Sequence, residues 1–379
     1  MKKMTPLLLV LILPLLGFTQ NNTLSDIDQL IVDWTFNGEY LKADSLLDAQ
    51  INRNVDNPKY YALKAPFYFY TRYFNPGTLR GDSLIQKMGE YAQKAIEIGK
   101  NSEMSLDNQY FVGLSYGYMA TFYARQGSYW NAYWAARSCK NYLADVLDED
   151  PTYTDAKMQP AIISYYTGLQ FGGFMGFLVW LVGMSGDRTE ALQEFHDVAE
   201  NGRFQKTEAR FVLFALYRYI ENDYVQAKQI GTAFLEQYPQ NLMVRRELPT
   251  LGFLTLVEEK GVGFLETEFD SLRTRYHITN PGILNTLGYT LVNQQRLDEA
   301  IEVLKINVKL FPAVANGYDS LSEVYLALGN LEMAIHNSRL CLQKLSADST
   351  INADFRQRLR EISETRLEEL GAGEEKVNI

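Results

Sequence analysis

The feature that most constrains the fold is a set of small residues that recurs every 34 residues near the end of the chain. Ala300 and Ala334 are separated by this interval. Each follows an apolar segment at helical spacing that contains one further small residue, Gly288 or Ser322. A repeat of this length holds two helices, and a small residue on each helix lets their backbones approach closely. The sequence therefore predicts a stack of antiparallel helix pairs.

Turn residues and helix-ending residues occupy matching places in these units. Gly329 lies five residues before Ala334, where a tight turn between two helices is needed. Pro312 follows the helix that contains Ala300 and should end it, because proline lacks an amide hydrogen. This order of residues resembles the tetratricopeptide repeat (TPR). The resemblance implies an all-α, right-handed superhelical solenoid built from antiparallel helix pairs.

The same pattern recurs upstream. Ala227 and Pro239 repeat the spacing of Ala300 and Pro312. The five-residue offset between a glycine and an alanine recurs at Gly38 and Ala43, at Gly127 and Ala132, and at Gly186 and Ala191. We expect seven or eight units, with the solenoid spanning residues 20–346. No stretch shows the sustained two-residue alternation of a β-strand, so strands are not expected.

The last charged segment predicts one more helix. Asn352 to Leu370 carries an apolar stripe at Phe355, Leu359, Ile362 and Leu370, which Leu367 widens at one edge and Arg366 interrupts. We interpret this segment as a capping helix that closes the last repeat against water. Residues 347–379 would then be the capping helix and a frayed tail.

The first residues have the pattern of a secretory signal peptide. Two lysines precede an apolar stretch from Leu7 to Leu16, and small or modest side chains follow it. We expect cleavage near Thr19 or Gln20, with residues 1–19 as the signal peptide. No cysteine follows the apolar stretch, so a lipoprotein is not expected. The sequence predicts an exported protein, periplasmic or extracellular.

The net charge argues against nucleic acid as a partner. The formal net charge is −10, and it becomes about −12 once the two lysines of the signal peptide are removed. Nucleic-acid affinity depends largely on Lys and Arg side chains that contact phosphates. We therefore expect a protein or peptide partner.

The cysteines and histidines do not form a recognisable site. Cys139 and Cys341 both lie in helical patterns 202 residues apart, and we expect two buried free thiols rather than a disulfide. His196, His277 and His336 fall in different units and have no partner at the i+4 spacing of a metal site. We expect no metal and no cofactor.

One motif suggests a catalytic serine. Gly113 to Gly117 matches G-x-S-x-G, with Ser115 at the position of the nucleophile. That motif requires a strand that leads through a strained turn into a helix. Ser115 instead falls inside a predicted helix, where Tyr116 fills the aromatic position of the repeat. We expect no catalytic role for Ser115.

The last two units also resemble a repeat pair found at the end of secreted bacterial hydrolases. The run Leu310-Phe311-Pro312, with Asn316, Tyr318-Asp319-Ser320-Leu321 and Tyr325, carries this resemblance. In those proteins a hydrolase domain precedes the repeats. Here further repeats precede them, so the resemblance does not imply an enzyme.

Residues 158–186 contain no charged side chain, and their most apolar part is Leu169–Met184. One interpretation is a membrane span, and a second is an exposed hairpin that touches a membrane or a partner. We favour a third, a helical insertion at about residues 169–185 that folds back onto the repeats. A span needs about 20 apolar residues, and exposing the large side chains of this segment, with Trp180 among them, would be costly.

The first helix of each unit, helix A, should line a concave groove, which repeat solenoids use to bind partners. The residues predicted to face this groove are Phe69, Tyr70, Tyr219, Asn285, Tyr289, Asn293, Asn316 and Asp319. Amide side chains of this kind can bond the backbone of an extended peptide. Asn285 and Tyr289 replace two residues of the basic carboxylate clamp found in chaperone-binding TPR proteins. We predict a non-enzymatic scaffold or adaptor in the cell envelope.

The aromatic content leaves one alternative open. Aromatic residues make up 13% of the chain and cluster at Tyr60–Phe74 and Tyr110–Trp134. Most of these rings should pack between helices. A glycan- or small-ligand-binding module would use rings that remain exposed, so exposed Tyr and Trp side chains would favour it and their burial would exclude it.

Overall fold

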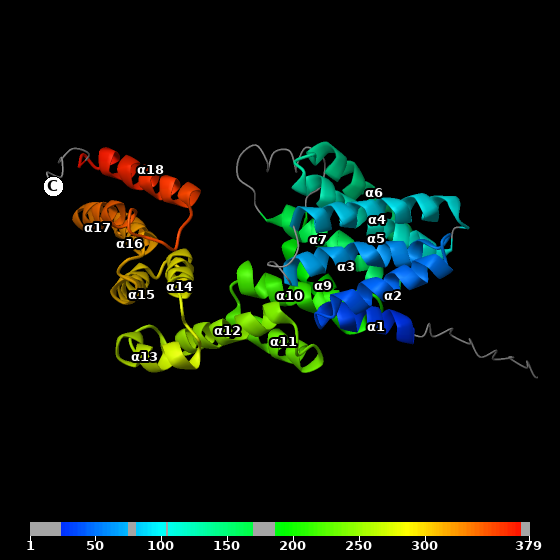
Figure 1. Ribbon diagram of the computed structural model, residues 1–379, viewed down its shortest axis with the longest axis horizontal. Coiled ribbons are helices and arrows are strands. Elements are labelled where there is room, and N and C mark those ends of the chain that lie inside the picture. Colours follow the sequence, from blue (N-terminus) through cyan, green and yellow to red (C-terminus); the bar gives the residue numbers. More distant parts are fainter. Residues whose placement is uncertain (1–23, 75–80, 104, 170–185, 373–379) are drawn as a thin grey trace, which may run out of the picture. The chain divides into compact units, whose positions relative to one another are not determined.

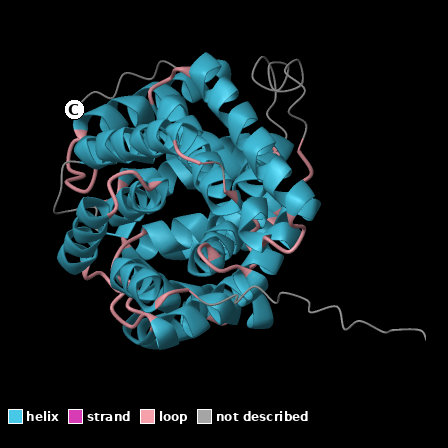
Figure 2. Cartoon of the chain, turned by 90° about the vertical axis from the view of Figure 1, so that its right-hand side faces the viewer, coloured by secondary structure: helices cyan, strands magenta, loops and turns pink. Residues whose placement is uncertain are grey.

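The computed structural model describes residues 24–74, 81–103, 105–169 and 186–372. Within these ranges every regular element is a helix (Figure 2), which confirms the all-α prediction. The chain divides into two compact units. The first contains the described residues up to Thr35, those of Glu39–Phe69 and those of Arg80–Ala209. The second contains Phe36–Gly38, the described part of Tyr70–Leu79, and the described residues from Arg210 onward.

The first unit consists of helix pairs that pack in chain order (Figure 1). Its main helices are α1 (Asp26–Phe36), α2 (Tyr40–Arg53), α3 (Pro58–Phe74), α4 (Gly81–Asn101), α5 (Leu106–Arg125), α6 (Tyr129–Glu149), the 3₁₀ turn η1 (Thr154–Lys157), α7 (Met158–Gly168) and α9 (Arg188–Asn201). Helix α5 packs on both α4 and α6, and α7 packs on α9.

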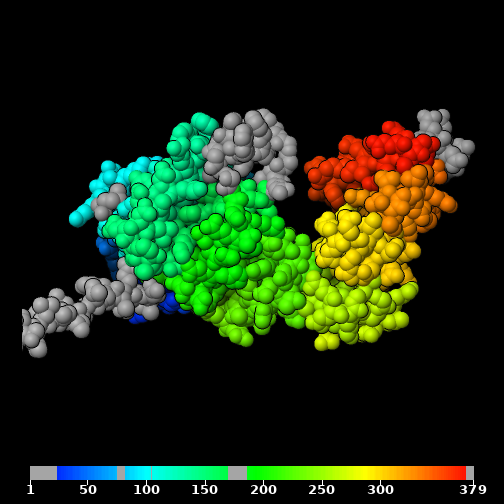
Figure 3. Space-filling model, turned by 180° about the vertical axis from the view of Figure 1, so that it is seen from behind, coloured from blue at the N-terminus to red at the C-terminus, as the bar shows by residue number. Residues whose placement is uncertain are grey.

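The second unit continues the pattern. Its helices are α10 (Lys206–Tyr219), α11 (Tyr224–Gln237), α12 (Leu242–Lys260), α13 (Leu265–Arg275), α14 (Gly282–Asn293), α15 (Leu297–Leu310), α16 (Ala315–Ala327), α17 (Leu331–Lys344) and α18 (Ala353–Glu369). From α14 to α18 each helix packs on the next, and Figure 3 shows this part of the chain as a stack that runs from yellow to red. The ends of α11 and α15 place Pro239 and Pro312 two residues after the last helical residue, as predicted.

The turns inside the helix pairs share one backbone conformation. Gly38, Gly127 and Gly329 have φ values of 81°, 71° and 73°, in the left-handed region that favours glycine. Asn222 and Gln295 adopt the same region, with φ values of 55° and 61°. In each case an alanine of the following helix lies five residues later, at Ala43, Ala132, Ala334, Ala227 and Ala300 respectively. The predicted glycine turns at Gly38, Gly127 and Gly329 are confirmed, whereas Gly186 does not have this conformation, and two further turns use other residues.

The small residues bring the paired helices together as predicted. A Cβ placed on Gly288 of α14 would lie 2.8 Å from the Leu304 side chain of α15. In the next pair the Ser322 hydroxyl donates a hydrogen bond of 2.7 Å to the carbonyl oxygen of Ala334. Ala300 and Ala334 are fully buried. These contacts repeat a helix-pair arrangement of tetratricopeptide type.

Enlarging the repeat alanines should therefore destabilise the fold. We expect Ala300→Leu and Ala334→Leu each to cost about 1–3 kcal/mol, because extra methylene groups enter a close helix contact. Thermal denaturation provides the measurement. Ala327→Leu, at an exposed site near the end of α16, is the control and should leave the melting temperature nearly unchanged. An unchanged melting temperature in either core variant would show that the repeat register is wrong.

The capping helix is present, but its buried face differs from the prediction. Asn352 caps the N-terminus of α18 by accepting a hydrogen bond of 2.8 Å from the amide of Phe355. Leu359 and Leu367 are buried, whereas Ile362 is 47% exposed. Arg366, interpreted as an interruption of the stripe, is itself buried. The predicted stripe is therefore correct at Leu359, at Leu367 and at Phe355, which packs against the core, but it was wrong at Ile362, because the ion pair of Arg366 takes part in the buried face.

The end of α7 contacts the residues that precede α9 in the first unit. A Cβ placed on Gly186 would come 1.8 Å from the carbonyl oxygen of Ser164, and one on Gly168 would come 2.9 Å from the carbonyl oxygen of Gly186. The Ser164 hydroxyl also accepts a hydrogen bond of 3.0 Å from the amide of Asp187. The end of α7 and the start of α9 therefore lie next to each other. The predictions for residues 170–184 and for Trp180 concern positions outside the described ranges.

Both cysteines are free and buried, as predicted. Burial raises the pKa of the Cys341 thiol to about 11, and burial also raises that of Cys139. Near pH 8 both thiols should therefore be protonated, and thiolate is the reactive form. We expect no rapid reaction with a thiol reagent such as Ellman's reagent in the native protein and two reactive thiols after denaturation. Rapid reaction of either thiol in the native protein would contradict its burial.

Candidate functional site

The candidate site lies on the hairpin formed by α5 and α6. Ser105 caps the N-terminus of α5, and its hydroxyl accepts a hydrogen bond of 3.2 Å from the Asn108 amide. A Cβ placed on Gly113 would lie 2.6 Å from Leu143, so this glycine allows the two helices to approach closely. Gly127 forms the turn between them. The hairpin is thus fixed by local signals of the repeat.

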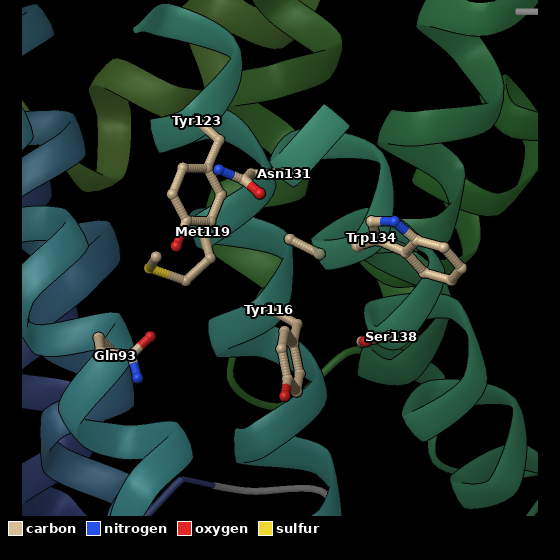
Figure 4. A pocket seen from close by; sticks show the side chains of 8 residues that line it. Gln93, Tyr116, Met119, Tyr123, Asn131, Trp134 and Ser138 are labelled. Atoms are coloured by element: carbon tan, nitrogen blue, oxygen red, sulfur yellow. The ribbon is translucent and has the colours of Figure 1, made fainter. Parts of the chain in front are cut away.

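An open pocket of about 290 Å³ lies along this hairpin, with α4 contributing one wall. Figure 4 shows its lining, which comes from three successive helices of the first unit. The lining residues are Gln93 from α4, then Tyr116, Met119 and Tyr123 from α5, and Asn131, Trp134, Ala135 and Ser138 from α6. We call these eight residues the α5–α6 pocket.

The pocket has an apolar floor and polar edges. Met119 and Ala135 are 4% and 5% exposed and belong to the core. Trp134 is 46% exposed, and the Gln93 and Asn131 amides are exposed as well. The lining contains amide and hydroxyl groups but no charged side chain. Such a site suits a ligand that presents flat apolar groups together with uncharged hydrogen-bonding groups.

Four aromatic side chains lie at the start of α6, and one of them, Trp134, also lines the pocket. Tyr129, Trp130, Tyr133 and Trp134 form an aromatic surface. The Trp130 ring stacks on Tyr133 at 5.6 Å and meets Trp134 edge-on at 5.7 Å. Tyr129 and Trp130 are 62% and 64% exposed. The exposed rings contrast with those of α3, where Tyr60, Tyr61 and Tyr68 pack in the core.

The charge around the aromatic surface differs from that of the whole chain. Residues 108–144 contain no Asp or Glu, although the chain has 46 of these residues and a net charge of −10. They contain Arg125, Arg137 and Lys140. The Arg137 guanidinium lies 5.5 Å from the centre of the Trp134 ring and donates a hydrogen bond of 3.3 Å to the Tyr133 hydroxyl. These contacts hold the rings in place on the helix surface.

The predicted groove residues are divided between the two units, and Tyr70 and Asp319 among them are buried. Phe69 belongs to the first unit, where its ring is partly buried against the core at 5.9 Å from Tyr118. Tyr70 belongs to the second unit and is 3% exposed. Tyr70 therefore packs between helices and is not open to a partner. Phe69 and Tyr70 differ in their surroundings because adjacent residues of a helix point about 100° apart.

In the second unit the predicted residues of α14 and α16 lie in neighbouring repeats. The Tyr289 hydroxyl donates a hydrogen bond of 2.6 Å to Glu323, which connects the two helices. Asn285 and Asn316 are partly exposed, and Asn293 is exposed. Tyr219 on α10 is 47% exposed.

Asp319 has a different role from the one predicted. Its carboxylate accepts a hydrogen bond of 2.8 Å from Arg366 of α18, and both side chains are 9% exposed. Burial raises the pKa of Asp319, and the guanidinium of Arg366 partly offsets this rise. The prediction that Asp319 faces an open groove was wrong because the capping helix covers it.

The groups considered for chemistry are dispersed. The Ser115 hydroxyl is buried inside α5 and donates a hydrogen bond of 2.7 Å to the carbonyl oxygen of Phe111, which is a helix-internal contact and not a nucleophile elbow. Within the described ranges no three His, Cys, Asp or Glu side chains are grouped as metal ligands. None of the helices described is both long and apolar enough to cross a membrane.

The 34-residue interval, the left-handed turns and the close contacts of helix pairs agree with one repeat type. The described residues therefore fold as an all-α stack of helix pairs of tetratricopeptide type. No protein-family model and no curated protein matches the sequence of this chain.

Several solved structures are similar to this chain. A tetratricopeptide repeat protein from Parabacteroides merdae is 14% identical, with a TM-score of 0.29, over 89% of this chain and 97% of its own. The P58(IPK) TPR domain is 13% identical, with a TM-score of 0.26, over 91% of this chain and 99% of its own. The human IFIT1 dimer with PPP-AAAA is 13% identical, with a TM-score of 0.33, over 82% of this chain and 69% of its own.

Proposed function

We propose that this TPR chain is a non-enzymatic scaffold or adaptor that binds a segment of another protein. The observation that carries the proposal is the aromatic surface, where Tyr129, Trp130 and Trp134 are 46–64% exposed beside an open pocket. Clustered exposed rings on a soluble protein mark an interaction site. Trp and Tyr also dominate the binding energy of protein interfaces, because they bury a large area with few rotatable bonds.

The helix-A residues of the second unit provide a further proposed contact area. Asn285, Tyr289, Asn293 and Asn316 present amide and hydroxyl groups on α14 and α16. Groups of this kind can bond the backbone of an extended segment. We propose this area as a separate contact area of the second unit.

Nucleic acid does not fit the proposal. The aromatic surface has Arg125, Arg137 and Lys140 nearby, but the whole chain has a net charge of −10. A phosphate backbone would be repelled by most of such a protein, and its binding depends on many cationic contacts. A protein segment does not require them.

The proposal predicts that a partner protein requires the exposed rings for binding. Tagged native chain, the double variant Trp130→Ala/Trp134→Ala and the control Leu41→Ala are expressed in the native cell and purified gently. Leu41 is 86% exposed and lies on α2, away from the rings in sequence. We expect the recovered amount of at least one co-purifying protein to fall about tenfold in the double variant, because an interface hot spot is lost. The recovered amount should be unchanged in the control. If no protein depends on the rings, the proposed function is wrong.

We also propose that the protein acts outside the cytoplasm, as the first 19 residues indicate. The expected result is a mature chain that begins at or next to Gln20. The intact mass of the protein recovered from the periplasm or the medium provides the measurement. Recovery of the uncleaved chain from the cytoplasm alone would contradict export.

A second candidate function is glycan binding, and the exposed rings favour it as well. Sugar rings have apolar faces that pack on aromatic rings, and their hydroxyls can bond the Gln93, Asn131 and Ser138 side chains of the pocket. This function predicts that the chain binds an oligosaccharide and that Trp134→Ala abolishes this binding. It also predicts that no protein partner requires the rings for binding.

A further inference from the structure

We propose that the α5–α6 pocket binds a proline-rich segment in the polyproline II conformation. This inference rests on the proposed function, since it names the kind of protein segment that the site accepts. It is based on the spacing of the lining residues, on their pairing across the groove and on the absence of charge in the lining.

The lining residues form two stripes of equal length. Tyr116, Met119 and Tyr123 lie at positions i, i+3 and i+7 of α5, and Asn131, Trp134 and Ser138 lie at the same spacing on α6. Seven residues of helix correspond to about 10 Å along its axis, at 1.5 Å per residue. One turn of a polyproline II helix is about 9 Å long, whereas side chains on one face of a β-strand repeat every ~6.7 Å. The separation of Tyr116 and Tyr123 therefore matches a polyproline II turn better than a strand.

The antiparallel helices pair the two stripes in opposite order. Figure 4 shows Tyr123 beside Asn131 at one end of the pocket and Ser138 at the end where Tyr116 lies, with Trp134 between them on α6. Each end thus combines a tyrosine ring with a polar side chain. A polyproline II segment has no internal hydrogen bonds, so its carbonyl oxygens can accept from the asparagine amide, the indole N–H and the serine hydroxyl. The rings can meanwhile contact the proline rings.

The lining favours an uncharged segment that needs little ordering. No charged side chain lines the pocket. The charged groups beside its rings are cations, Lys100 at 5.2 Å from the Tyr116 ring and Arg137 at 5.5 Å from the Trp134 ring, so a cationic ligand group would lose water without gaining a counter-charge. The walls are preorganised, because Tyr116 stacks on Tyr142 at 5.7 Å and Trp134 meets Tyr133 edge-on at 5.2 Å. Proline-rich segments are preformed as well, and aromatic-lined grooves recognise them for this reason.

A synthetic decaproline peptide tests the inference, with a glycine-serine peptide of equal length as the ligand control. Binding to the purified chain is measured by isothermal titration calorimetry. We expect saturable binding of decaproline and none of the glycine-serine peptide. Tyr123→Ala and Trp134→Ala should each raise the Kd by about tenfold, which corresponds to the loss of one good ring contact. Leu41→Ala, an 86% exposed side chain on α2 outside the pocket and the aromatic surface, should change the Kd by less than about twofold.

Three results would overturn the inference. One is the absence of saturable decaproline binding at millimolar peptide, and another is binding that Tyr123→Ala and Trp134→Ala leave unchanged. The third is tighter binding of a chito-oligosaccharide that displaces decaproline, which would assign the pocket to sugars. A failure with decaproline is distinguishable from a failure of the scaffold function, because a protein that co-purifies through Trp130 and Trp134 would still be found in the first case.

Discussion

Replacing Arg366 with alanine is expected to destabilise the second unit by about 3–5 kcal/mol. Arg366 lies on α18 and donates a 2.8 Å hydrogen bond to Asp319 of α16, and both side chains are 9% exposed. Its removal leaves the carboxylate of Asp319 buried without a counter-charge. The same guanidinium lies 3.5 Å from the Ser338 hydroxyl, which bonds Ser322 at 2.8 Å, so three helices share this polar contact. Urea denaturation followed by circular dichroism measures the loss.

The matched control is Arg360→Ala on the same helix, where the side chain is exposed. It should change the stability little. The double variant Asp319→Leu/Arg366→Met should recover most of the lost stability, because replacing both buried charges by apolar groups removes the unpaired carboxylate. If Arg366→Ala costs no more than Arg360→Ala, the ion pair does not anchor the capping helix.

Replacing Phe36 with alanine is expected to cost about 3–5 kcal/mol, the usual range for a buried phenylalanine. Phe36 is 5% exposed and ends α1, where its carbonyl oxygen accepts a hydrogen bond of 2.8 Å from the Asn241 side chain. Its ring lies at the centre of an aromatic cluster of the second unit. The ring partners are Tyr70 at 5.1 Å, Phe74 at 5.6 Å, Phe234 at 5.9 Å, Tyr238 at 5.9 Å and Phe211 at 6.3 Å.

The measurement is the midpoint of urea denaturation, with Tyr129→Ala as an exposed-ring control. Tyr129 is 62% exposed, so its loss should leave the midpoint almost unchanged. Equal midpoints for Phe36→Ala and the native chain would mean that the aromatic cluster does not hold the second unit together.

The repeat could be predicted from the sequence because its signals are local. Glycine at a left-handed turn and alanine at a close helix contact are imposed by backbone sterics. A glycine pattern does not indicate the turns at Asn222 and Gln295, because these residues adopt the left-handed conformation without being glycine. Their alanine partners, Ala227 and Ala300, lie at the same five-residue offset and give the better signal.

The buried face of α18 could not be predicted from an apolar stripe alone. Its partner Asp319 lies 47 residues earlier in the chain, and only the tertiary contact explains why an arginine is buried. An apolar stripe therefore includes Ile362, which is exposed, and leaves out Arg366, which is buried. A buried arginine is stable when it is paired with a carboxylate, which a periodicity argument does not consider.

The candidate site was only partly visible in the sequence. Tyr116 was identified as a repeat aromatic and was assigned to packing, whereas the structure places its ring on the pocket wall. Trp134 lay in an aromatic cluster, but burial and exposure within that cluster depend on how α5 and α6 pack. One usable signal was the absence of Asp and Glu from residues 108–144 of an acidic chain.

The central claim is that the rings at the start of α6 contact a partner protein. Its most direct test places the photo-crosslinking residue p-benzoylphenylalanine at Tyr129 and, as a control, at the 86% exposed Leu41, each in the full chain in its native cell. The scaffold proposal predicts a discrete covalent adduct with another protein after irradiation at position 129, and no such adduct from position 41. No adduct from position 129, or the same adducts from both positions, would contradict it.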